Sequence, residues 1–416
     1  MSSALPSYDQ AAAMVAAYAA QWAKSRPSVE RVELGAAAGR VLAKPICADR
    51  DQPPFARSTR DGFACQAADA STHEFLPIAG STRAGLAPAG PVPQGSAWEI
   101  MTGAPVPAGA DAVVMLEHVE TSEERIRLLP SRKIACGENI VAQGAQARER
   151  DELLPAGTAI AFAQIALAAT CGCSELDVFV RPRVAILTTG DELVSVDSEP
   201  SPGQIRNSNA PMLAAMVAAA GGEPWVLPTA ADTAKALDNS LTEGAKADML
   251  LISGGVSAGK FDLVESALAR LGAQFHFTGV RIQPGKPLVF GELPGSKGRV
   301  VPFFGLPGNP VSSAVTFLLF ATPLLGALAG RLEVGPRFAL ARLARETDKR
   351  GKPGLTRFLP AYCTFGRVAG ELPEAALVSF QGSGDLAALA RSNCFLVIPE
   401  DAHRLSAGEV ARILLP

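Results

Sequence analysis

The chain has 416 residues, of which 48% are hydrophobic and 19% are charged, and its net charge is −3. That length exceeds one ordinary domain core, and the composition excludes a mainly disordered chain. Lysine and arginine form no basic stripe, so we expect no nucleic-acid partner. The 7 cysteines include no C-x-x-C pair and show no disulfide-like spacing, which predicts a reducing compartment and a cytoplasmic location.

Two apolar stretches resemble export or membrane segments. Residues 7–25 follow an acidic rather than a basic flank, so we expect an amphipathic helix there and not a secretory signal. Residues 311–330 carry no charge and are long enough to span a bilayer. They also contain serine, threonine, proline and glycine, and the sequence has no second such segment. We therefore expect a buried core helix at 311–330 and no membrane partner.

The first half of the chain contains a region of short strands followed by a helical run. Between 48 and 147, short apolar runs alternate with proline and glycine clusters, which predicts a β-rich unit of many short strands. Around 160–172, the run AFAQIALAATCGC has helical character. This run returns the chain to an α/β body.

The second half alternates more regularly. From 181 to 330, helical runs at 209–221, 233–245 and 262–271 alternate with the strand-like runs RVAILTT, EPWVLPT, ADMLLIS and VVPFFGLPGNP. Such alternation predicts a doubly wound α/β unit, with a parallel sheet covered on both faces. The short runs RFALARL, CFLVIP and EVARILL predict a small all-β terminal unit at 331–416.

Three unusual loops follow strands of the α/β unit, at the edge where parallel sheets collect ligands. TTGDEL places Gly190 before two acids, and SGGVSAGKFD combines two glycines with Asp262. GLPGNPVSS offers Asn309 as a helix N-cap and Pro310 as the first helical residue. Exposed amides at helix starts bind phosphate and other oxyanions, so these loops predict an anion site.

The same loops carry carboxylates. Glu192 and Asp262 would repel a bound phosphate unless a divalent cation lay between them, and magnesium prefers oxygen ligands of this kind. Each loop alone is also explained by ordinary turn chemistry, with Asp262 acting only as a helix N-cap. Three such loops at one sheet edge favour a magnesium and phosphate site.

A P-loop is the enzyme alternative for the second loop. Gly254, Gly259 and Lys260 match three fixed positions of G-x-x-x-x-G-K-[ST]. The fourth position is Phe261, which lacks the hydroxyl that ligates magnesium in a P-loop. A P-loop-type ATPase is therefore the weaker interpretation.

Candidate residues also lie outside these loops. Lys286 lies in the stiff turn IQPGKPLVFG, where it is either solvated or binds an anion. In the β-rich region, Asp61 and Thr102 lie on glycine turns, and sequence alone does not bring them to the α/β loops. The histidines are isolated from one another, which excludes a Ser-His-Asp set or a histidine-based zinc site.

The motifs then match a known family in order, from about residue 40 to residue 400. They resemble those of the molybdopterin molybdenumtransferase family, which includes bacterial MoeA and the C-terminal domain of gephyrin. The matching segments are PPFxxSxxDGFA, MTGAPVPxGADAVVxxE, TTGDEL, SGGVSxGxxD, PGKPLVFG, GLPGNPVSS and QGSGDLAALARSNCFLVIP.

This resemblance implies an enzyme of molybdenum cofactor biosynthesis. It would insert molybdate into the dithiolene of adenylylated molybdopterin, releasing AMP with Mg²⁺ as cofactor. The family also implies an elongated homodimer whose active site lies between the two subunits. Four domains are expected: an α/β linking domain (1–47 and 148–180), an elongated β-rich domain (48–147), the molybdopterin-binding α/β domain (181–330) and a barrel-like C-terminal β domain (331–416).

The resemblance assigns roles by matching positions. Asp61 and Thr102 would act from one subunit as catalytic residues, and Glu192 and Asp262 from the other. Magnesium would be held by Glu192, Asp232 and Asp262. The pterin phosphate region and molybdate would be bound by Gly190, Gly254, Gly255, Ser257, Lys286, Gly308, Asn309, Pro310 and Ser383.

Some positions depart from the family pattern. Gln283 stands where a basic residue is usual, Gln146 where an acid is expected, and Pro360 where an arginine is expected, with Arg357 as a nearby substitute. These changes support the alternative of a cofactor-binding or scaffold protein without catalysis. Molybdopterin adenylyltransferase and molybdoenzyme chaperones are the expected protein partners.

Overall fold

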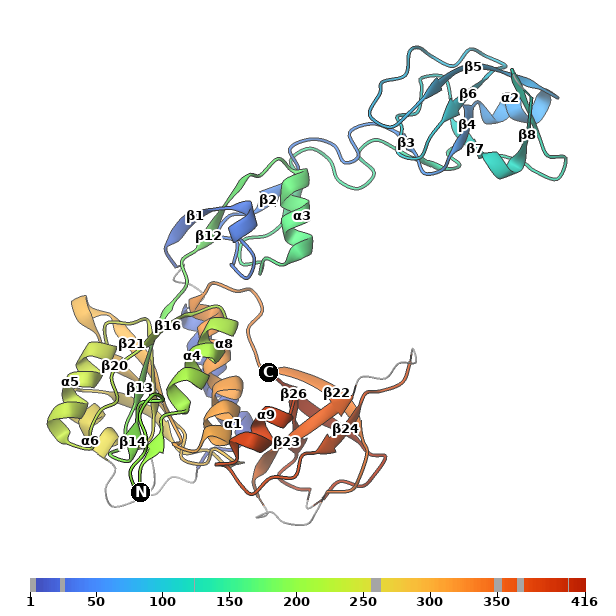
Figure 1. The fold of residues 1–416 in the computed structure, drawn as a ribbon. Coiled ribbons are helices and arrows are strands. Elements are labelled where there is room, and N and C mark those ends of the chain that lie inside the picture. The colour runs from blue at the N-terminus through green and yellow to red at the C-terminus, as the bar shows by residue number, and fades with distance from the viewer. Residues whose placement is uncertain are drawn as a thin grey trace.

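The structure is a computed structural model that describes residues 5–22, 27–122, 124–255, 263–347, 354–364, 370–402 and 404–416. The chain forms an α/β unit, a closed β-barrel beside it, a small linking unit and a β-rich unit (Figure 1). The β-rich unit lies at the far end of the linking unit from the α/β unit. The expected fold class, α/β with additional β units, is confirmed. The domain boundaries given above stay predictions.

The α/β unit is built on a six-stranded sheet. Its first four strands are parallel, as the alternation of strands and helices predicts. The last two strands pair antiparallel, so the sheet is mixed rather than purely parallel. In order across the sheet the strands are β16 (Glu223–Val226), β13 (Arg183–Thr188), β17 (Met249–Ser253), β21 (Val300–Leu306), β20 (Val289–Pro294) and β18 (Gln274–Thr278).

Helices cover both faces of this sheet because successive strand residues point to opposite sides. Val184 and Ile186 of β13 belong to one core, while Ala185 and Leu187 belong to the other. The first core includes residues of α4 (Asn209–Ala219) and of the long apolar helix, and the second those of α5 (Ala234–Gly244) and α6 (Leu263–Arg270). A doubly wound arrangement follows.

The long apolar helix lies in the first core. It runs through α7 (Pro310–Thr316), a π-helical segment η4 (Phe317–Ala321) and α8 (Thr322–Leu328). Pro323 has no N–H to donate, and the preceding Thr322 N–H reaches Phe317 O, five residues back, which widens the turn. Of its most apolar window, 89% is buried inside the protein. The predicted core helix is confirmed.

Helix α1 (Tyr8–Trp22) packs against α8 and contributes Tyr8 and Val15 to the same core. The first helix was expected within the linking unit, but its buried face contacts the α/β unit instead. A strand of two residues, β19 (Ile282–Gln283), leaves the α/β unit and pairs with the barrel. These contacts attach the α/β unit to its neighbours.

The barrel is closed because its strand β23 pairs with both β24 and β25. A short helix, α9 (Leu386–Arg391), precedes β25. The strands in order are β23 (Thr356–Thr364), β24 (Glu374–Leu377), β22 (Arg337–Leu343), β26 (Val410–Leu415) and β25 (Cys394–Ile398). Closure leaves no free edge in the ring itself.

The linking unit contains helix α3 (Phe162–Thr170) and two antiparallel strand pairs, β1 (Val29–Glu33) with β12 (Glu175–Phe179), and β2 (Ile46–Cys47) with β11 (Glu152–Leu154).

The chain enters and leaves the β-rich unit through one strand pair, β3 (Arg57–Ser58) with β10 (Ile140–Val141). Its six-stranded sheet, flanked by α2 (Ala67–Thr72), has the order β7 (Ala112–Met115), β4 (Gly62–Cys65), β6 (Ala97–Ile100), β5 (Leu76–Thr82), β9 (Arg125–Leu128) and β8 (Val119–Ser122).

Candidate functional site

A pocket of about 640 Å³ opens at the carboxyl ends of β13, β17 and β21, where the predicted loops converge. A pocket at this edge is the expected place for a ligand of an open α/β sheet. The predicted site residues that line it are Gly190, Glu192, Asp232, Gly254, Gly255, Gly308, Asn309 and Pro310. The structure therefore brings these separate sequence motifs together.

The first loop continues from β13 through Thr189 and Gly190. Gly190 has φ +146°, and a Cβ built on it would lie 2.6 Å from Glu192 Oε2. The glutamate side chain thus lies directly over the Gly190 backbone, at the pocket wall. A Cβ at this position would displace the carboxylate, and the positive φ itself favours glycine.

The second loop follows β17. Gly254 has φ +96°, and a Cβ there would meet Thr189 O at 2.5 Å. A Cβ on Gly308, in the third loop, would lie 3.6 Å from Gly254 Cα. Adjacent backbones approach closely because none of these positions carries a side chain. The rest of the predicted motif, Ser257, Lys260, Phe261 and Asp262, lies outside the described residues.

The third loop begins helix α7. Pro310 is its first residue, as predicted, and Asn309 occupies the N-cap position with extended backbone. Its side chain does not cap the helix, which corrects our expectation. Instead Asn309 Nδ2 donates to Ser383 Oγ at 2.8 Å, and Val311 N donates to Ser383 O at 3.0 Å. Ser383 belongs to the barrel unit, so that unit completes the turn.

Sequence reasoning missed the segment Asn207–Asn209, which also lines the pocket. Asn209 Nδ2 donates to Ser253 Oγ at 2.8 Å and to Gly308 O at 2.6 Å, which ties three loops together. The available signal was the run Asn-Ser-Asn before a helix, because these residue types favour helix starts. At the carboxyl edge of a sheet, such a start adds amides to an anion site.

Two buried polar atoms at the pocket have no hydrogen-bond partner among the residues that the structure describes. They are Thr189 Oγ1 and Asn209 Oδ1, both on residues that line the pocket. Buried polar atoms are paired in the great majority of cases, and an orphan indicates a missing ligand or water. The pocket is therefore arranged to receive a polar group.

Acidic side chains gather at the rim. Asp191 Oδ1 accepts a hydrogen bond from Asp232 N at 3.0 Å, and Glu192 lies in the same loop as Asp191. Burial raises the pKa of the Asp232 carboxyl, and the negative charges of Asp191 and Glu192 raise it further. Within the described ranges, no three acidic, histidine or cysteine side chains form a group that could hold a metal ion.

Asp61 and Thr102 form a pair in the β-rich unit. Asp61 Oδ1 accepts from Thr102 N at 2.6 Å and from Thr102 Oγ1 at 2.8 Å. The backbone hydrogen bond and then the hydroxyl bond lower the pKa of the Asp61 carboxyl. Both residues are exposed, and their unit lies far from the α/β pocket of the same chain (Figure 1).

Comparison with known proteins identifies the family. Residues 6–172 match the MoeA N-terminal region (domain I and II), 185–327 a probable molybdopterin binding domain, and 341–415 the MoeA C-terminal region (domain IV). A molybdopterin molybdenumtransferase from Nostoc sp. is 35% identical over 403 residues, covering 94% of this chain and 89% of that protein. The chain belongs to the molybdopterin molybdenumtransferase family.

Other members agree with this assignment. The molybdopterin molybdenumtransferase of Haemophilus influenzae is 32% identical over 387 residues, covering 92% of this chain and 93% of that protein. The crystal structure of the molybdopterin biosynthesis moeA protein from Pyrococcus horikoshii OT3 aligns with a TM-score of 0.80 at 29% identity. That alignment covers 99% of this chain and 100% of the other.

Lys286 and one position that departs from the molybdenumtransferase family pattern, Gln283, lie between the pocket and the barrel. Lys286 is exposed in a turn whose next residue, Pro287, lines the pocket. Gln283, in β19, is the strand partner of Arg357. The Arg357 side chain is not presented to an oxyanion: the residue is 3% exposed, and its Nη2 donates to Ala402 O at 3.2 Å. The suggested substitution by Arg357 is therefore wrong.

The two remaining departures lie in different units. Pro360 is buried in β23, where its carbonyl accepts from Val378 N at 3.0 Å. Pro360 is therefore a structural residue of the barrel. Gln146 is exposed between the linking and β-rich units, and its backbone N–H donates to Gln52 O at 2.8 Å.

Proposed function

We propose that this chain inserts molybdate into adenylylated molybdopterin and releases AMP, in a site shared by two copies of the chain. Family membership makes it a transferase of molybdenum cofactor biosynthesis. The observation that carries the finer proposal is the pocket with unpaired Thr189 Oγ1 and Asn209 Oδ1, within the region matched as a probable molybdopterin binding domain.

The pocket suits a phosphorylated ligand. Asn209 begins α4 and Pro310 begins the long apolar helix, and both residues line the pocket. Free amides and the positive end of the helix dipole stabilise a bound phosphate. Gly254 and Gly255 let that phosphate approach the backbone, because no Cβ intervenes. The phosphoanhydride of adenylylated molybdopterin would be held by these amides.

The acidic rim fits a divalent cation. Glu192 and Asp232 line the pocket, and the raised pKa of Asp232 reflects burial and carboxylate repulsion, which a cation would relieve. These two residues would hold Mg²⁺, with Asp262 as the third predicted ligand. Magnesium, when bound, supplies positive charge to the phosphoryl oxygens during cleavage.

The chain's other residues would position the reacting groups. Lys286 and Ser383, beside the pocket, would hold the tetrahedral molybdate. A water or molybdate oxygen would attack the phosphoanhydride, breaking its P–O bond with AMP as the leaving group. The two dithiolene thiols would then bind molybdenum, and one molybdate oxygen would leave as water with the two thiol protons. Asp61, kept ionised by Thr102, would act on this site from the partner copy, because its own pocket is out of reach.

Reconstitution tests the activity. Purified chain, adenylylated molybdopterin, molybdate and Mg²⁺ should release AMP together with molybdenum cofactor. Binding of adenylylated molybdopterin without AMP release would instead support the scaffold or carrier alternative. Molybdopterin adenylyltransferase as substrate donor, and molybdoenzyme chaperones as recipients of the product, complete the proposal.

Subunit mixing tests the shared site. Asp61→Asn and Glu192→Gln variants should each be inactive alone. After mixing and exchange, half of the dimers would be hybrids with one intact site, so about a quarter of wild-type activity should return. Mixing Asp61→Asn with Asp61→Ala is the matched control and should restore none, since both changes affect the same half. No recovery in the first mixture would contradict the shared site.

A further inference from the structure

Two connectors join the linking unit to the β-rich unit, and they run side by side. One comprises residues 48–56, between β2 and β3, and the other residues 142–151, between β10 and β11. Gln52 and Ala147 form an isolated antiparallel bridge midway, with N···O distances of 2.8 and 3.1 Å. The β-rich unit is therefore held by a narrow, two-chain neck.

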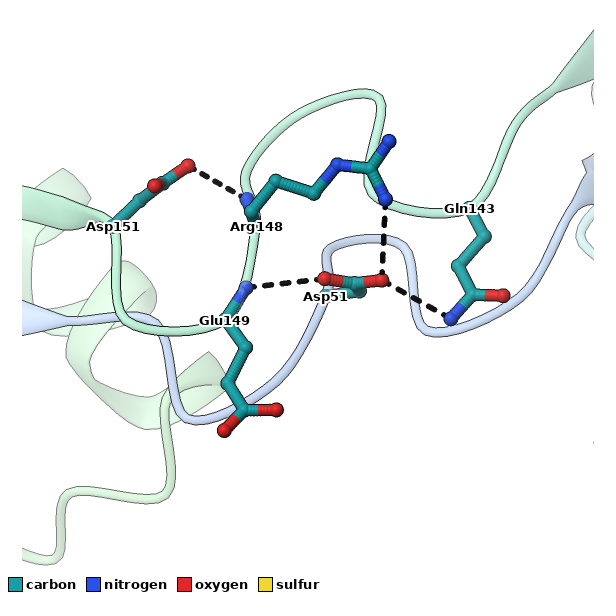
Figure 2. Close-up of polar contacts among 5 residues, drawn as sticks. All are labelled: Asp51, Gln143, Arg148, Glu149 and Asp151. Carbon is teal, nitrogen blue, oxygen red and sulfur yellow. Dashed lines mark hydrogen bonds and ion pairs between the residues drawn. The ribbon is translucent and has the colours of Figure 1, made fainter.

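The side chain of Asp51 accepts hydrogen bonds from the second connector on both sides of the Gln52–Ala147 bridge (Figure 2). Asp51 Oδ1 accepts from Glu149 N at 3.1 Å, while Oδ2 accepts from Gln143 Nε2 at 3.1 Å. Arg148 Nη1 lies 3.5 Å from the same Oδ2. The Asp51 side chain is only 23% exposed. We call this carboxylate and its three partners the Asp51 junction.

The second connector is shaped to deliver these partners. Arg148 N donates to Asp151 Oδ2 at 2.7 Å, which fixes the backbone before the bend. The Arg148 side chain then folds over Gly144, where a Cβ would lie 2.8 Å from Arg148 Nη1. Gly144 has φ +68°, a conformation that favours glycine. The Asp151 contact and the lack of a side chain at Gly144 therefore allow the Arg148 guanidinium to reach Asp51.

We propose that Asp51 is a positioning residue, which fixes the direction of the β-rich unit and thereby the placement of Asp61 and Thr102 in catalysis. The role in catalysis rests on the proposed function. A neck of two chains can bend and twist at its loop residues. Besides the Gln52–Ala147 bridge, backbone hydrogen bonds join the connectors at Ala48 (Arg150 N to Ala48 O, 2.8 Å) and at Pro53 (Gly144 N to Pro53 O, 2.9 Å), and the Asp51 side chain links the connectors between these points. Asp51 adds contacts to residues 143 and 149, so it opposes rotation about the Gln52–Ala147 bridge.

Distance measurements test the junction directly, in the full-length chain. Cys47 of the linking unit and Cys136 of the β-rich unit are exposed, so both accept spin labels once Cys173 is replaced by Ser. Dilution with unlabelled chain restricts the signal to pairs within one copy. Wild type should give one narrow distance distribution, and Asp51→Ala should about double its width. Asp49→Ala is the matched control, because the Asp49 carboxylate approaches Arg50 of its own connector at 4.0 Å and makes no hydrogen bond or ion pair with the second connector among the described residues.

Kinetics separate positioning from general damage to the fold. In Asp51→Ala, kcat for AMP release should fall about tenfold, while KM for adenylylated molybdopterin stays within about twofold, because the binding pocket lies in another unit. Asp49→Ala should leave both constants unchanged. If Asp51→Ala does not fold, the surface pair Gln143→Ala and Arg148→Ala removes both Oδ2 partners and should have the same effects.

Specific results would overturn the proposal. An unchanged distance distribution in Asp51→Ala would show that the junction does not set orientation. A broadened distribution with unchanged kcat would remove its role in catalysis. Failure of wild type to release AMP would contradict the proposed function instead, and the distance distributions would then decide the junction independently of activity.

Discussion

Asp61 shows how one hydroxyl sets the charge of a candidate catalytic group. Two hydrogen bonds from Thr102 lower its pKa, so the pair contributes stability above the unfolded pKa, which is lost as pH falls through the folded pKa. Thr102→Val removes only the hydroxyl bond. The pKa of Asp61 should then rise part of the way to its ordinary value, as measured by carbon-13 NMR titration.

A matched control is available nearby. Thr59→Val removes a hydroxyl that donates to Asn139 O and makes no bond to Asp61. The Asp61 pKa should be unaffected in this variant. Equal pKa values in wild type and Thr102→Val would show that the hydroxyl does not tune the carboxylate.

The pKa shift of Asp232 has the opposite sign to that of Asp61. Burial and then repulsion from Asp191 raise its pKa, so its charge destabilises the protein as pH rises through the folded pKa. Without divalent cations, Asp232→Asn should raise the thermal midpoint at neutral pH, and the advantage should vanish below the ordinary Asp pKa. Magnesium-dependent AMP release should fall in the same variant.

Thermal unfolding across a pH series measures this effect. Asp197→Asn serves as the control, because Asp197 is an exposed aspartate that lies outside the pocket lining. A midpoint for Asp232→Asn that equals wild type at every pH would contradict the repulsion argument.

At the scale of elements, the loop after β17 depends on close backbone contact. Gly254→Ala places a Cβ at 2.5 Å from Thr189 O, at a φ of +96°. The expected cost is about 1–3 kcal/mol of unfolding free energy, with KM for adenylylated molybdopterin raised about tenfold. Denaturant titration and steady-state kinetics would measure the two effects.

Gly203 provides the comparison for this change. It also has positive φ, at +90°, but a Cβ there meets nothing within 4 Å. Gly203→Ala should cost about 1 kcal/mol, from backbone strain alone, and leave KM unchanged. If both variants behaved alike, the collision with Thr189 O would not matter.

Regular elements were largely predictable, for a physical reason. The runs RVAILTT and ADMLLIS became β13 and β17 because continuous apolar runs suit strands buried on both faces. The antiparallel strands β18 and β20 were missed, although they pair with neighbours close in the chain, because the residues between them were interpreted as a lysine-bearing turn rather than as part of the sheet. The π-helical turn at Phe317–Ala321 was also missed, because it arises only where Pro323 follows an already buried helix.

Part of the pocket lining was visible in the sequence, and part was not. Glycine loops and acids marked the pocket, because their chemistry is visible in the residue types. Asn309 binding to Ser383 and the burial of Arg357 depend on the barrel meeting the α/β unit, which sequence does not show. Asn209 was missed because its bonds reach residues 44 and 99 positions away.

At the scale of the whole molecule, the proposed site between two copies predicts that activity depends on assembly, because the Asp61–Thr102 pair lies far from the pocket of its own chain (Figure 1). Specific activity should be constant at high protein concentration and fall on dilution, because single copies hold no complete site. Mass photometry on the same samples should show the dimer fraction falling in parallel. Activity that persists in samples of single chains would contradict a site formed between copies.

The contact between Ser383 and the start of α7 has a practical consequence for work on fragments. A recombinant piece ending near residue 330 would retain every strand of the α/β sheet. It would lack the carbonyl that accepts the Val311 amide, the partner of the Asn309 side chain, and the pocket wall at Gly384 and Leu386. Ligand screens on such a fragment would meet a wider, more hydrated opening, so affinities obtained with it would understate those of the intact chain.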